Sequence, residues 1–107
     1  MRHDYKEMMR YRIDEMDKRK EHMSKRLEER IKHMEEMNED MLKRFEDRLK
    51  FRGHSEEEIR NILDERMKEN DRRKEEMIRV MEERINDIDR RREELSKNMN
   101  ELVDDEE

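Results

Sequence analysis

The chain has 107 residues, of which 58% are charged and 29% are hydrophobic, and its formal net charge is −6. A length of this order allows one domain at most, and no segment approaches the roughly 20 consecutive apolar residues that span a bilayer. Because cysteine is absent, disulfides are excluded and the redox compartment stays undetermined. We therefore expect a soluble single domain over residues 1–107.

A first helix is predicted over about residues 4–51. Its hydrophobic residues recur every eighteen positions, as the related segments MSKRLEERIKHM and MLKRFEDRLKFR show. Eighteen residues make five turns of an α-helix at 3.6 residues per turn. A repeat of this length keeps the apolar stripe straight along the helix, whereas strict heptads impose a supercoil. The pattern predicts a long, nearly straight helix.

Residues 52–55 form the expected loop. Gly53 is the single glycine of a chain without proline, and it suits the left-handed residue that follows a helix. Ser55 is a favourable N-cap, and Glu58 three residues later completes a capping-box pattern. We take Gly53, Ser55 and Glu58 as the loop and cap residues.

A second helix is predicted over about residues 56–103, where the repeat continues in MIRVMEERINDI. The repeat keeps its phase across the loop, so one continuous helix through Gly53 is an alternative. The glycine followed by a capping box favours two antiparallel helices instead. The predicted fold class is therefore all-α, a hairpin of two long straight helices.

The hydrophobic rows of the repeat predict a seam along which helices pack. A two-helix hairpin covers only part of such a stripe, so we expect two hairpins to pair as a homodimeric four-helix bundle. A monomeric hairpin and higher oligomers remain alternatives. The predicted seam comprises Met9, Ile13, Leu27, Ile31, Phe45, Leu49, Leu63, Met67, Met81, Ile85, Ile88 and Met99.

Polar residues interrupt this stripe once in each repeat. Lys20, Asn38, Lys74 and Arg92 occupy the interrupting position. They either extend their charged ends to water along the seam or set the register of helix pairing, as a polar residue can in a coiled coil. Arginines at the flanking position are expected to form a rim of ion pairs.

The two halves of the chain differ in charge. Residues 1–52 carry 16 basic and 14 acidic side chains, whereas residues 53–107 carry 12 and 20. This difference favours pairing between the halves, although salt weakens it. The chain lacks the concentrated basic face of a nucleic-acid-binding protein, and its low aromatic content argues against a membrane-surface helix.

No catalytic, cofactor or metal site is predicted. Methionine can bind soft metals, but twelve methionines at helical spacing are more simply core residues. His22 and His33 are about 16 Å apart along a helix, too far to share a metal ion. No nucleophile has a base at a helical neighbour spacing. We accordingly expect neither an enzyme nor a small-molecule substrate.

The alphabet of the chain is restricted, because Ala, Thr, Gln, Pro, Cys and Trp are all absent. Together with the periodic helices and the short capped loop, this resembles de novo designed or binary-patterned helical-bundle proteins. The resemblance covers the whole chain and implies no biochemical activity. The predicted function is a structural, self-assembling helical scaffold. The alternatives are an interaction module that binds helices through a Met-rich face, and an extended coiled-coil rod.

Overall fold

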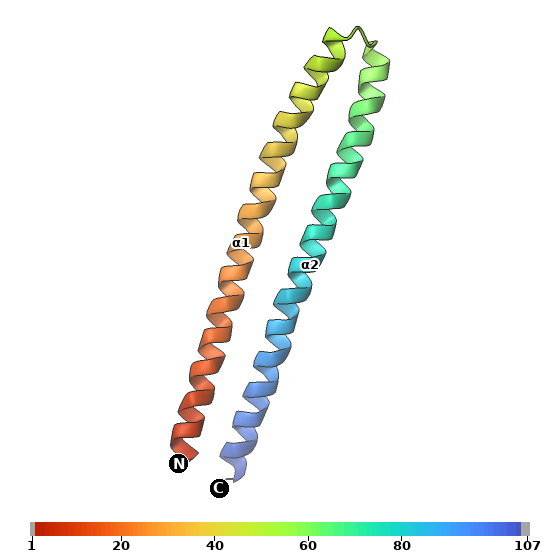
Figure 1. Ribbon diagram of the computed structural model, residues 1–107. Helices are drawn as coiled ribbons and strands as arrows, with labels where there is room; N and C mark the ends of the chain where they lie inside the picture. Colours follow the sequence, from red (N-terminus) through yellow and green to blue (C-terminus); the bar gives the residue numbers. More distant parts are fainter. Residues whose placement is uncertain (1, 106–107) are drawn as a thin grey trace. The chain divides into compact units, whose positions relative to one another are not determined.

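A computed structural model describes the backbone of residues 2–105 and the side chains of residues 4–101. Helix α1 runs from Arg2 to Phe51 and helix α2 from Glu56 to Asp105, and the described residues contain no strand (Figure 1). The all-α prediction is therefore confirmed. The first helix ends and the second begins at the predicted residues, although both extend about two residues further at their outer ends.

Packing divides the chain into two units. The turn unit comprises residues 27–79 and contains the end of α1, the turn at residues 52–55 and the beginning of α2. The terminal unit comprises residues 1–26 and 80–107, and within it the beginning of α1 lies beside the end of α2. In each unit the two helical segments run in opposite directions, so the predicted hairpin is confirmed.

The end of α1 has the hydrogen-bond pattern of a Schellman motif. The Gly53 N–H donates to the Lys50 carbonyl at 3.1 Å, and the His54 N–H donates to the Leu49 carbonyl at 3.1 Å. Gly53 lies in the left-handed region with φ of 85°. A continuous helix through Gly53 is therefore wrong: the left-handed residue turns the chain away, and α1 ends at Phe51.

The beginning of α2 is capped by side chains. The Glu58 N–H donates to the Ser55 hydroxyl oxygen at 3.2 Å, and that hydroxyl donates to the Glu58 carboxylate at 3.1 Å. The other carboxylate oxygen lies 3.1 Å from His54 Nδ1. The predicted capping residues thus meet, and His54 joins them from the turn. Their bonds satisfy a helix N–H that has no partner within the helix.

The hydrophobic core of the hairpin is thin. Among the described side chains, the buried hydrophobic residues are Met9, Ile13, Leu27, Leu49, Ile59 and Met81. None of these is completely enclosed, and no polar side chain is buried. Two helices in contact leave much of each helix surface open, so most apolar residues are only half-covered.

Replacing Gly53 should destabilise the hairpin through its backbone alone. A Cβ atom at this position would meet no atom within 4 Å, so no steric clash is involved. For Gly53→Ala we expect a loss of about 1 kcal/mol in the free energy of unfolding, because L-residues disfavour positive φ. Gly53→Asn should lose less, since Asn tolerates this conformation. Urea denaturation of the three proteins measures the difference; equal stability of the Gly and Ala forms would contradict a left-handed residue here.

Candidate functional site

The helix interfaces are the candidate site, because the predicted function is assembly. Of the predicted seam, Met9, Ile13, Leu27, Leu49 and Met81 are buried, and Ile31, Phe45, Leu63, Ile85, Ile88 and Met99 are half-buried. Met67 is exposed at 49%. Ile59 is buried although it was not assigned to the seam. It lies eighteen positions after Met41 and eighteen before Met77, and this repeat spacing is the signal that could have identified it.

In the terminal unit, the polar residues that interrupt the stripe reach across to the opposite helix. Lys20 Nζ on α1 lies 2.8 Å from the Asp89 carboxylate on α2. Arg92 Nε on α2 lies 2.6 Å from the Asp17 carboxylate on α1. The two pairs are reciprocal, because each helix supplies one acid and, three residues later, one cation. We call these four residues the charge quartet.

The turn unit contains half of a second quartet. Lys74 Nζ on α2 lies 3.0 Å from the Glu35 carboxylate on α1. The equivalent pair would join residues 38 and 71, but residue 38 is Asn and not a cation. Asn38 is instead half-buried beside the equally half-buried Asn70.

Two of these ion pairs raise the pKa of their cations. The hydrogen bond and the charge of Glu35 raise the pKa of Lys74, and those of Asp17 raise the pKa of Arg92. In the cap, hydrogen bonds from His54 and Ser55 lower the pKa of Glu58. All of these groups remain accessible to solvent, at least in part, so the pairs orient the helices more than they stabilise them.

The polar interruptions also show where the apolar side chains point. Residues three positions apart differ by about 60° in direction around a helix. Asp17 and Lys20 both reach α2, so the direction of α2 from α1 lies between the directions in which these two side chains point. Met23 points about another 60° around the axis of α1, beyond Lys20. Met23 therefore points further away from the direction of α2 than Lys20 does. The stripe faces partly toward the neighbouring helix and partly toward one side of the hairpin.

The same order of acid, polar residue and apolar residue recurs four times. It appears on α1 as Asp17–Lys20–Met23 and Glu35–Asn38–Met41, and on α2 as Asp71–Lys74–Met77 and Asp89–Arg92–Leu95. Each of these sets ends in an apolar residue. Because the helices are antiparallel, the apolar residues of opposite sets point to the same side of the hairpin. We call this side the open face: Met23 and Leu95 in the terminal unit, Met41 and Met77 in the turn unit.

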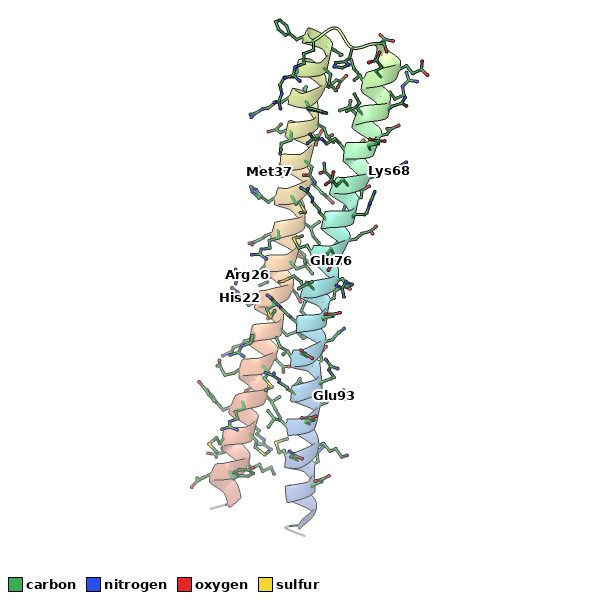
Figure 2. The ribbon with its side chains drawn as sticks, turned by 45° about the vertical axis from the view of Figure 1, so that its right-hand side comes forward. His22, Arg26, Met37, Lys68, Glu76 and Glu93 are labelled. Atoms are coloured by element: carbon green, nitrogen blue, oxygen red, sulfur yellow. The ribbon has the colours of Figure 1, made fainter. Side chains whose placement is uncertain are left out.

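Side chains on the open face are only partly covered. Met41 is exposed at 55%, and Met37, one turn before it, at 49%; Met37 is labelled on α1 in Figure 2. Met23, Met77 and Leu95 are half-buried. The hairpin alone therefore does not complete the burial of these residues.

Phe45 lies beside a hollow in the turn unit. The Arg66 guanidinium carbon lies 4.4 Å from the centre of the Phe45 ring and that of Arg48 lies 5.9 Å from it, both within cation–π range. The hollow of about 110 Å³ next to this ring is also lined by Asn38 and Asn70. The two amides line a second hollow as well, of about 240 Å³. Packing is thus incomplete at the level of the amides.

The histidines and acids form no metal-binding group within the part of the chain that the structure describes. His22 and His33 are exposed, and His54 contacts Glu58 in the cap. His3 lies outside the described side chains. Neither α1 nor α2 contains, in its described residues, a stretch apolar enough to cross a membrane.

Comparison with family models, with curated proteins and with solved structures found no match for this chain. Its function must therefore be inferred from its own residues and packing.

Charge reversal at Lys20 should destabilise the hairpin modestly. Lys20→Glu would place a carboxylate beside Asp89, and we expect a loss of up to about 1 kcal/mol, since both side chains are partly exposed. The double variant Lys20→Glu/Asp89→Lys should recover most of it. Lys18→Glu is the control, because Lys18 pairs only with Glu15 on its own helix. A double-mutant cycle by urea denaturation at low and high salt tests the pair; no recovery in the double variant would argue against the contact.

The cap should make stability depend on pH in acid. Because the pKa of Glu58 is lowered in the folded state, its carboxylate favours folding at pH values above its ordinary pKa. This contribution is lost as pH falls through the lowered, folded-state pKa. The stability difference between the native chain and Glu58→Gln should shrink in acid. Thermal unfolding from pH 7 to pH 2 measures it, and a difference independent of pH would contradict the assignment.

Proposed function

We propose that this protein is a structural scaffold that assembles with itself, through its open face, into a homodimeric four-helix bundle. The observation that carries the proposal is the direction of the apolar stripe. A stripe that served only the hairpin would point straight at the neighbouring helix. Here it is centred between that helix and the open face, the geometry in which each helix of a four-helix bundle contacts two neighbours.

Exposed area supports the same proposal. The chain exposes 9320 Å² of surface. A compact folded monomer of 13.8 kDa exposes roughly 6,600 Å². The excess is larger than the roughly 800 Å² that each partner buries in a typical stable interface. A second copy could therefore cover the open face and still leave the charged sides of the helices in water.

A helix-binding module is the second candidate, favoured by the exposed methionines of the open face. Met is flexible and polarisable, so a surface that presents Met37 and Met41 can adapt to different apolar partners. An amphipathic helix from another protein would lie along the same face. In both readings the face binds helices, and the restricted alphabet points to artificial design with no enzymatic activity.

Introducing a charge on the open face should abolish assembly without unfolding the hairpin. For Met41→Asp we expect a shift from dimer to monomer, with the dissociation constant raised at least tenfold, because an unpaired carboxylate in an apolar interface costs well over 1.4 kcal/mol. The measurement is light scattering coupled to size-exclusion chromatography over a concentration series, with circular dichroism to follow helicity.

Tyr11→Asp is the matched control. Tyr11 is exposed at 66% on the same helix, about 120° away from the row of Met41. This variant should remain dimeric. If the native chain is monomeric at every concentration, self-assembly is refuted. If both variants dissociate equally, the open face is not the interface.

A further inference from the structure

We propose that the two hairpins of the dimer associate with their turns at the same end, so that α1 of each copy packs against α2 of the other. This inference rests on the proposed function and specifies the partner of each helix. Two hairpins related by a twofold axis can place their open faces together in two ways. With the axis parallel to the helices, α1 meets the partner's α2 and the turns coincide. With the axis perpendicular to them, like helices meet and the turns lie at opposite ends.

Charge complementarity favours the arrangement with coincident turns. Residues 1–52 carry 16 basic and 14 acidic side chains, a balance of +2, and residues 53–107 carry 12 and 20, a balance of −8. If like helices met, the strongly acidic second half would lie against its own copy. Packing α1 against the partner's α2 instead brings opposite net charges together, and like charges across an interface oppose association.

The ion pairs within the hairpin indicate the heights at which helices of the two copies would meet. In each ion pair between the helices, the two residue numbers add up to 109. These pairs are Asp17–Arg92, Lys20–Asp89 and Glu35–Lys74. A partner hairpin whose turn lies at the same end presents its α2 to α1 in about the same register.

Asn38 and Asn70 lie at one level of the hairpin, which we call the amide layer. This layer supplies a second, independent argument. Asn70 stands in the repeat row that holds Met16, Met34 and Ile88 within the helices and Arg52 in the turn, so an amide replaces an apolar side chain in the helical part of this row. Asn38 lies beside it, and the two line the same hollows. Neither amide hydrogen-bonds another side chain of the described chain. Both are half-buried, and a covering partner would remove them from water.

Coincident turns cover this layer with matching amides while the helices overlap along their length. When the turns coincide, layers of equal height meet, and Asn38 and Asn70 face the same amides of the second copy. When the turns lie at opposite ends, the layer meets a different level, where the same row holds Met16 and Ile88. An amide against these residues loses its water without gaining a hydrogen bond. A polar residue at an otherwise apolar position is a known way of specifying register.

The test is a distance between the two turns. The chain contains no cysteine, so Phe51→Cys, at a side chain exposed at 93%, introduces a single attachment point for a spin label beside the turn. Electron–electron double resonance on the labelled dimer should give one distance of about 30 Å or less, set by the width of a bundle. Light scattering on the same sample reports the mass.

Substitution of the amide should weaken the preference. In labelled Asn70→Met we expect a second, longer distance population of at least one tenth of the dimers, because the apolar layer no longer distinguishes the two arrangements. Asn61→Met is the matched control, since Asn61 is exposed on the same helix and lines neither of the two hollows. It should keep the single short distance of the native chain.

The outcomes separate the two proposals. A monomeric mass would refute the proposed function itself. A dimeric mass with turns about 70 Å apart, or about 40 Å apart if only the amide layers of opposed hairpins overlap, would leave the scaffold intact and overturn the arrangement. A short distance that Asn70→Met leaves single would overturn the role of the amides.

Discussion

The register between the two helices is the constraint on which the rest of the structure depends, and the turn sets it. Gly53 in the left-handed conformation ends α1, and the Ser55–Glu58 cap starts α2 three residues after that glycine. With so short a connection, the helices can slide past one another only by breaking one of these two motifs. The ion pairs of both units share one register, which shows that no local shift occurs within either.

Given that register, side chains at different positions of the eighteen-residue repeat make different contacts. Acids and the polar interruptions meet across the hairpin, and the apolar residue three positions further turns to the open face. The exposed ion pairs add little free energy, so their main effect is to decide which side of the hairpin becomes apolar. Hydrophobic burial, the larger driving force, is then left incomplete on that side. The proposed scaffold function follows from this imbalance, because a second copy would complete the burial.

Much of the fold could be read from the sequence because its signals are local. Helix formation follows from spacing and from the lack of interrupting residues, and the turn follows from one glycine and a capping pattern. The side-chain contacts were less predictable. Met67 repeats the spacing of buried residues but is exposed, because its layer also holds Asn38 and Asn70, which leave hollows between the helices. Ile59 is buried because the turn brings the helices together just before it.

The sequence by itself determined the all-α class, the two helices and the place where they reverse, since each depends on residues that are neighbours along the chain. Only the tertiary structure decided what the polar interruptions do. Lys20, Lys74 and Arg92 could have extended to water along their own helices, and their acidic partners are 39 to 75 positions away in the chain. Periodicity shows which side chains share a face but not the direction in which the neighbouring helix lies. That direction is a property of packing, and it identifies the open face.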